Sequence, residues 1–289
     1  MLPIKSRYRL CELFDIPIYI DISLIILLLF FATGNGSLAD GLGCALLLLV
    51  SITAHEFGHA LTARAFGYET RDITLSLLGG CASLISLPRK AGQEFLTAVA
   101  GPAVSFLLSA LGVTCLASMA VIGGFADALD FVWTMVLHSF GISASFSGSL
   151  IIDPETSDFL VGMACYLSIM NAVLGIFNLL PGFPLDGGRV FRSAMRSFMP
   201  RAKATYIAMI VGRVVAVGIA VSGVWRILHG RGWGFVTLMI AWMIWKEGYR
   251  EYVLARMESA WDYQDYRARV SPPPYGGDGG DCDVTRDKD

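Results

Sequence analysis

The sequence predicts an α-helical polytopic membrane protein with about six transmembrane helices and a small membrane-associated β-sheet or hairpin. Hydrophobic residues make up 55% of the 289 residues and charged residues only 16%, and the mean hydropathy is +0.60. Soluble domains are about 45–50% apolar and about 25% charged. The apolar residues also come in long blocks, and about 20 apolar residues are needed to cross a bilayer as a helix.

Five blocks after the N-terminus qualify or nearly qualify as spans, and a sixth, at residues 21–32, is short. The five are 41–65, 95–123, 159–180, 204–228 and the short 233–245. Lysine and arginine are absent from the 33–40 and 124–157 loops, and they occur before the first span, at 64–90, at 189–203 and after the last span. Arg226 and Arg231, beside a very short outer turn, are minor exceptions. This alternation predicts six spans with both termini in the cytosol.

Charge and cysteine usage exclude other classes. The net charge of −2 provides no basic field, so we expect no nucleic-acid partner. The six cysteines form no C-x-x-C pair, which argues against a disulfide framework and against a thiolate zinc site.

Two short segments have the pattern of strands. Residues 13–20 alternate between apolar and other side chains, so we expect a strand with Pro17 at an edge or bulge, followed by a helix that Asp21 caps. Residues 72–88 read as a hairpin around Gly79–Gly80. Unpaired strand edges are not tolerated in lipid, so this hairpin must be covered by protein or line a wet cavity.

The second predicted span contains the sequence His-Glu-Phe-Gly-His at residues 55–59. On a helix, His55 and His59 lie one turn apart on one face and can share a metal ion, and Glu56 beside them can act as a base toward water. The alternative is a pair of core histidines with a buried glutamate. Each ionisable group at membrane depth costs at least about 2.5–3.5 kcal/mol, so three of them need a compensating cation.

Catalytic zinc usually takes three protein ligands, and the best candidate for the third is Asp186. It follows Pro181 and Pro184, which end the preceding span, and precedes Gly187–Gly188, which we expect to let the chain turn. The alternative role for Asp186 is the N-cap of the next helix.

Two amides precede this segment. Asn178 lies near the end of the predicted span at 159–180. Asn171 lies about two helical turns earlier on a similar face, and is either a group that supports the site or a polar packing residue.

These motifs resemble the site-2 protease family of intramembrane zinc metalloproteases. The matching features are HEFGH at 55–59, Gly101-Pro102, N-x-x-P-x-x-P-L-D-G at 178–187 and the Leu78-Gly79-Gly80 hairpin, and the resemblance covers about residues 10–200. It implies one Zn²⁺ per chain held by His55, His59 and Asp186. It also implies that Glu56 is the catalytic base and that Asn178 holds the substrate or the oxyanion.

The same resemblance suggests further substrate-binding residues, for which we take Asn171, Gly79 and Gly80. We find no PDZ-like insertion and no regulatory CBS-type domain, so the chain resembles a compact member of the family. We expect a metalloprotease domain at 1–250, with a catalytic core at about 10–200 and two further spans at about 204–246. A cytosolic tail at 251–289 follows, disordered from 271 onward because it is rich in Pro, Gly and Asp.

The expected function is a zinc metalloendopeptidase that cleaves a membrane protein substrate in or near its transmembrane segment, close to the cytosolic side. The expected location is the lipid bilayer of a bacterial inner membrane. A divalent metal-ion transporter is one alternative, although it should show symmetry between its halves and a polar path on both faces. A catalytically inactive scaffold is another, against which the intact Glu56 argues.

Other residues have plainer interpretations. Glu94 is expected to be a helix N-terminal charge, and Gly101 and Gly112 to permit close helix packing. A cytosolic stripe of three arginines after the site is expected to anchor a helix at the lipid headgroups. These are Arg189, Arg192 and Arg196.

Overall fold

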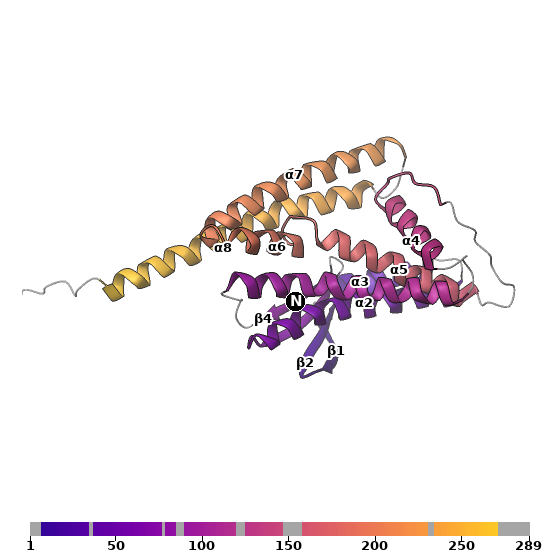
Figure 1. The fold of residues 1–289 in the computed structure, drawn as a ribbon, viewed down its shortest axis with the longest axis horizontal. Coiled ribbons are helices and arrows are strands. Elements are labelled where there is room, and N and C mark those ends of the chain that lie inside the picture. The colour runs from indigo at the N-terminus through magenta and orange to yellow at the C-terminus, as the bar shows by residue number, and fades with distance from the viewer. Residues whose placement is uncertain are drawn as a thin grey trace, which may run out of the picture.

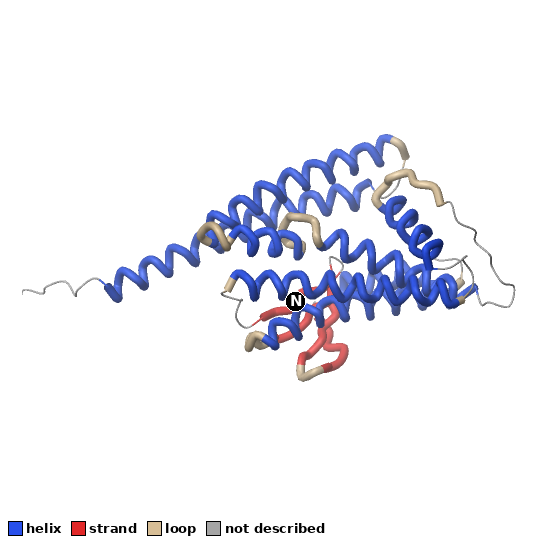
Figure 2. The backbone as a smooth tube through the Cα atoms, viewed as in Figure 1, coloured by secondary structure: helices blue, strands red, loops and turns tan. Residues whose placement is uncertain are grey.

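The computed structural model describes residues 7–34, 37–76, 79–84, 90–119, 125–146, 158–230 and 234–270. Long helices lie beside one another, and a small sheet packs at one side of them (Figures 1 and 2). Four helices are long and apolar enough to cross a membrane. They are α2 (Leu38–Ala65), α3 (Ala91–Ser118), α5 (Asp158–Asn178) and α7 (Arg201–Leu228).

The helices at the first and last of the six predicted spans are not among these four. The helix α1 (Ile22–Gly34) has only 13 residues. The helix α8 (Gly234–Val270) has 37 residues and continues unbroken past residue 250, where the sequence had placed the start of the tail. Six spans therefore stay a prediction, and residues 271–289 lie outside the described residues.

Two shorter helices complete the helical part. The helix α4 (Phe125–Ser139) packs against α3 and α5, and α6 (Asp186–Met195) packs against α3 and α7. The predicted location of residues 124–157 as a loop is therefore wrong in part, because α4 buries Ala128, Val132 and Val136.

The sheet has four strands in the order β1-β2-β3-β4. They are β1 (Arg7–Leu13), β2 (Ile16–Asp21), β3 (Thr70–Ser76) and β4 (Gly79–Leu84). The predicted strand corresponds to β2. The sequence did not indicate β1, which contains no β-branched residue, the type most enriched in strands.

Pro17 does not mark an edge strand, because β2 lies between β1 and β3. The parallel ladder to β3 begins only at Ile18, so Pro17 lies outside it and removes no hydrogen bond from it. The cap at Asp21 is confirmed, since its carboxylate accepts from the Ser23 N–H at 2.9 Å.

The predicted hairpin is confirmed as β3 and β4, which pair antiparallel with Leu75 opposite Gly80 and Ser76 opposite Gly79. Gly79 and Gly80 therefore lie in β4 and not at the turn, and residues 77–78 and 85–88 of the predicted hairpin lie outside the described residues. Its strand β4 ends the sheet and lies against α2. Protein therefore covers part of this strand, as the membrane setting requires.

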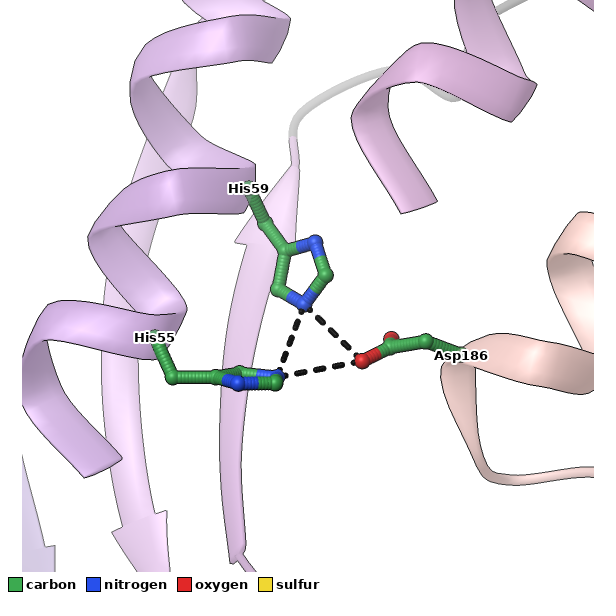
Figure 3. Close-up of side chains that lie close together, drawn as sticks. All are labelled: His55, His59 and Asp186. Atoms are coloured by element: carbon green, nitrogen blue, oxygen red, sulfur yellow. Dashed lines mark hydrogen bonds and ion pairs between the residues drawn. The ribbon is translucent and has the colours of Figure 1, made fainter. Parts of the chain in front are cut away.

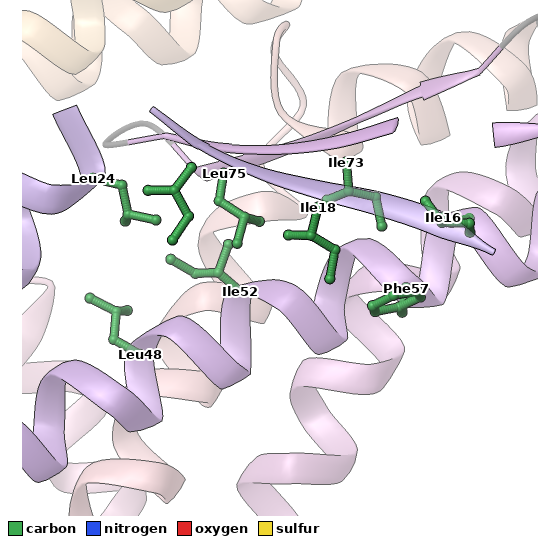
Figure 4. Close-up of a cluster of buried hydrophobic side chains, with 10 residues drawn as sticks. Ile16, Ile18, Leu24, Leu48, Ile52, Phe57, Ile73 and Leu75 are labelled. Atoms are coloured by element: carbon green, nitrogen blue, oxygen red, sulfur yellow. The ribbon is translucent and has the colours of Figure 1, made fainter. Parts of the chain in front are cut away.

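The core between sheet and helix follows the period of each element (Figure 4). Alternate residues Ile16, Ile18 and Ile20 of β2 are buried against Leu48 and Ile52 of α2. Helical spacing places 48, 52, 55 and 59 on one stripe of α2, so the apolar contact with the sheet leads directly into the histidine pair.

Candidate metal centre

Three side chains from two helices converge on one point (Figure 3). His55 and His59 lie one turn apart on α2, and Asp186 is the first residue of α6. The Oδ2 atom of Asp186 lies 3.1 Å from His55 Nε2 and 3.2 Å from His59 Nε2. The two Nε2 atoms are 3.2 Å apart, and among the described residues this is the one such ligand group.

These separations fit a tetrahedral zinc ion. Zinc binds imidazole nitrogen and carboxylate oxygen at about 2.0–2.2 Å, so two of its ligand atoms lie about 3.3–3.5 Å apart. The three observed separations of 3.1, 3.2 and 3.2 Å are close to that value. Two imidazoles and a carboxylate are also a donor set that suits zinc.

The helix α3 orients both imidazole rings through their other nitrogens. His59 Nδ1 donates to the carbonyl oxygen of Thr97 at 2.7 Å, which leaves the lone pair of Nε2 for a ligand bond. His55 Nδ1 and the hydroxyl of the fully buried Ser105 are hydrogen-bonded at 2.8 Å. Such partners of metal-ligating histidines fix the ring orientation.

Sequence reasoning missed Thr97 and Ser105. Thr97 acts through its backbone carbonyl, which every residue type carries. Ser105 belongs to no motif. It lies eight residues after Thr97, about two helical turns, so both residues face the same side of a helix, and this spacing was the one available signal.

Gly101 on α3 has a more specific role than helix packing. A Cβ at this position would lie 2.2 Å from His59 Nε2 and 2.7 Å from His55 Nε2. Its missing side chain therefore provides the space for the two rings. Gly112 acts as predicted, because a Cβ there would lie 2.3 Å from Ser168 Oγ on α5.

The N-cap alternative for Asp186 is wrong, because the N-cap of α6 is Leu185 and Asp186 lies inside the first turn. Burial alone would raise the pKa of the Asp186 carboxyl. The neighbouring His59 and His55 lower that pKa by more than burial raises it, so the pKa lies below its ordinary value. Asp186 is therefore a carboxylate, the form that binds a metal ion.

The glycines after Asp186 serve close packing, and the expectation that they turn the chain is wrong. Gly187 and Gly188 both lie in α6. A Cβ at Gly187 would lie 2.3 Å from the carbonyl oxygens of Leu179 and Leu180. The start of α6 thus packs directly on the segment between α5 and α6, which sets the position of Asp186.

The other predicted site residues surround this centre. Glu56 is buried on α2 and lies near enough to His59 to interact with it electrostatically. Asn178 is the last residue of α5 and is partly buried. Gly79 and Gly80 begin β4. Their catalytic and substrate-binding roles stay predictions.

Asn171 is fully buried and joins two spans. Its Nδ2 atom donates to Ser51 Oγ on α2, one turn before His55, and to the carbonyl oxygen of Leu167, both at 2.9 Å. This contact favours a packing role near the site, and a direct substrate contact stays a prediction.

Glu94 lies in the first turn of α3, as predicted, whereas the expectation that Arg192 and Arg196 anchor a helix at the lipid headgroups is wrong. Arg192 is buried, with 3% of its side chain exposed, and pairs with Glu94. Arg196 pairs with the same carboxylate. They bind protein carboxylates and not headgroups.

A His-His-Asp site with an adjacent glutamate, built on helices long enough to span a bilayer, is typical of membrane-embedded zinc metalloproteases. Residues 43–219 match the model of peptidase family M50. The chain belongs to this family, and the resemblance to site-2 proteases is confirmed. It is an integral membrane protein.

Curated relatives agree with this assignment. The relative sll0528 of Synechocystis sp., named as a zinc metalloprotease, is 33% identical over 258 residues, which are 83% of this chain and 58% of the relative. Zinc metalloprotease MJ0392 of Methanocaldococcus jannaschii is 28% identical over 218 residues, 74% of this chain and 53% of the relative. The chain thus spans little more than half the length of either relative.

A solved structure has the same fold. The site-2 protease from Methanocaldococcus jannaschii matches with a TM-score of 0.51 at 23% identity, over 85% of this chain and 95% of that chain.

Proposed function

We propose that this protein is an intramembrane zinc metalloendopeptidase that hydrolyses a peptide bond in or near a transmembrane segment of a membrane protein. The observation that carries the proposal is the convergence of His55, His59 and Asp186, with Glu56 buried beside them on a helix long enough to span a bilayer. Membership of peptidase family M50 supports the same activity.

The chemistry divides between a metal ion and the side chains. Zinc, when bound, supplies Lewis-acid polarisation of a carbonyl and acidifies water. Glu56 takes the proton of the attacking water and passes it to the leaving amide nitrogen. The amide of Asn178 donates to the carbonyl oxygen as negative charge develops there, a contribution of roughly 10²–10³ in rate.

The substrate must be extended at the cleaved bond, because a helical peptide bond is protected by its own hydrogen bonds. The strand β4 ends the sheet and lies against α2, the helix that carries both histidines. We infer that an extended substrate segment adds to β4 by main-chain hydrogen bonds. Gly79 and Gly80 at the start of β4 lack side chains that would obstruct it.

The orientation follows from the distribution of basic residues. Arg64 lies at the end of α2 near the histidines, and the 33–40 and 124–157 loops carry no lysine or arginine. We therefore place the site near the cytosolic side, with both termini in the cytosol of a bacterial cell and the six-span arrangement.

The test begins with metal content, measured by mass spectrometry on the full chain in detergent. We expect one tightly held zinc per chain, and a large loss in Asp186→Ala. The wild type and Glu56→Gln are then incubated in nanodiscs with a library of fluorescently labelled single-span membrane peptides. Cleavage by the wild type alone supports the proposal.

Two results would favour the alternatives. Zinc flux into proteoliposomes that contain a zinc-sensitive dye would indicate a transporter. Well-folded wild type without metal or cleavage would indicate a scaffold.

A further inference from the structure

A buried cluster of charges joins three helices at the end of α6 that lies away from Asp186. We propose that Arg192 is a positioning residue that holds Asp186 within reach of the histidine pair, with Glu94 and Glu251 as its two anchors. The inference rests on the proposed function, because it assigns a role toward the metal ion that this function requires.

Arg192 contacts three different parts of the chain. Its Nε atom donates to Glu94 Oε1 at 2.8 Å, and Nη2 lies 2.6 Å from the same oxygen. Its Nη1 atom donates to Glu251 Oε2 on α8 at 2.8 Å. The guanidinium also lies over the ring of Phe183, 4.9 Å from the centroid. Arginine suits this role because its planar fork makes several directed hydrogen bonds at once.

Arg192 and the ring of Phe183 that it contacts flank Asp186 in the sequence. Phe183 precedes Asp186 by three residues and is 1% exposed, and Arg192 follows Asp186 by six residues on the same short helix. The segment that carries the carboxylate is therefore held on both sides by one guanidinium.

The anchor Glu94 lies on α3, the helix that orients the histidines. Glu94 is in the first turn of α3, three residues before Thr97, whose carbonyl oxygen accepts from His59. Both carboxylate oxygens of Glu94 are bound, one by Arg192 and the other by Arg196. Glu94 thus fixes α6, with its aspartate, to α3, which sets the rings of both histidines.

A short helix needs such contacts. The helix α6 has ten residues, and isolated helices shorter than about 12–15 residues are marginal in water. Its position therefore depends on tertiary contacts. Groups hydrogen-bonded to a metal ligand typically change metal affinity by about 10–100-fold when they are removed, and Arg192, which acts one contact further from the ligand, should have an effect at the lower end of this range.

The two anchors differ in burial. The Glu94 side chain is 8% exposed and that of Glu251 is 32% exposed. Glu94 is therefore the stronger anchor, and Glu251 adds a link from α8. The C-terminal half of α8 extends beyond the other helices (Figure 1).

The test measures the zinc dissociation constant of the full chain in detergent by chelator competition, together with the melting temperature of the metal-free protein. We expect Arg192→Lys and Glu94→Gln to raise the dissociation constant by about tenfold or more, and Glu251→Gln to raise it by a smaller factor. The matched control is Glu258→Gln, also on α8. It breaks a bridge to Arg201 of α7 at 3.1 Å that involves no residue of α6, so zinc affinity should not change.

A double variant separates positioning from stability. Glu94→Gln with Arg192→Met removes the two most buried charges of the cluster together, and Glu251 is exposed enough to remain solvated. Arg196, whose side chain is 14% exposed, keeps the amide oxygen of the introduced glutamine as an acceptor. We expect this variant to melt near the wild type without metal and yet to bind zinc at least about tenfold more weakly.

The outcomes are distinguishable. Folded Arg192 and double variants with the zinc affinity of the wild type would overturn the inference and leave the proposed function intact. A wild type that binds no zinc would overturn both. An equal loss of affinity in Glu258→Gln would also overturn the inference, because the effect would then be a general consequence of loosening α8.

Discussion

Replacing Gly101 with alanine should disable the metal centre by adding a single methyl group. The new Cβ would lie 2.2 Å from His59 Nε2, 2.5 Å from His59 Cε1 and 2.7 Å from His55 Nε2. Non-bonded heavy atoms prefer separations of about 3.5–4.0 Å, so the overlap exceeds 1 Å for the nearest atom. Either a ring rotates away or α2 and α3 separate, and both changes move Nε2 off the ligand position.

The magnitude follows from the loss of one ligand in three. Structural zinc sites with four ligands bind with about 10–16 kcal/mol in total, which is about 3 kcal/mol for each ligand. A loss of that size corresponds to roughly a hundredfold rise in the dissociation constant. Chelator competition on the purified full chain measures this change, and melting of the metal-free protein measures the fold.

Two glycines on the same helix serve as controls. A Cβ at Gly92 meets no atom within 4 Å, so Gly92→Ala should change neither quantity. Gly112→Ala has a comparable clash, at Ser168, and should lower the melting temperature without a specific loss of zinc. Wild-type zinc affinity in a folded Gly101→Ala protein would refute the reasoning.

Three further predictions concern side chains. Glu56→Gln should lower peptide cleavage by at least about 10²–10⁴-fold, the usual contribution of an acid–base group, with zinc content unchanged; appreciable cleavage would exclude Glu56 as the base. Ser105→Ala should raise the zinc dissociation constant by about 10–100-fold because His55 loses its orienting partner. Ser109→Ala, which removes a bond to the Ser168 carbonyl instead, is its control. Asn171→Ala should reduce the free energy of unfolding by about 1–3 kcal/mol because Ser51 loses its partner; an unchanged denaturation midpoint would contradict this.

The long apolar blocks predicted the long helices, and the His-x-x-x-His spacing predicted two of the residues of the candidate metal centre. A helix spaces residues by a fixed rise and rotation, so HEFGH places both histidines on one face in any helical context. Asp186 could also be predicted as a candidate ligand from the sequence, because prolines mark the end of the preceding span just before it. The alternation at residues 16–20 predicted β2, since its alternate isoleucines face the core.

Contacts between residues far apart in the sequence could not be predicted from such local patterns. Arg192 meets Glu94, which lies 98 positions earlier, and no local pattern distinguishes this buried arginine from a headgroup anchor. The space at Gly101 likewise exists only because α3 passes beside the histidine face of α2.

The sequence by itself determined the four long apolar helices that can span a bilayer, the residues that can bind a metal ion and the glutamate that lies beside them. These properties depend on hydropathy and on the short-range geometry of a single helix. Only the tertiary structure decided which backbone carbonyl and hydroxyl orient the rings, why a glycine lies against them and what holds α6 in place. Such features arise where separate helices pack together, and packing brings together residues whose spacing along the chain carries no signal.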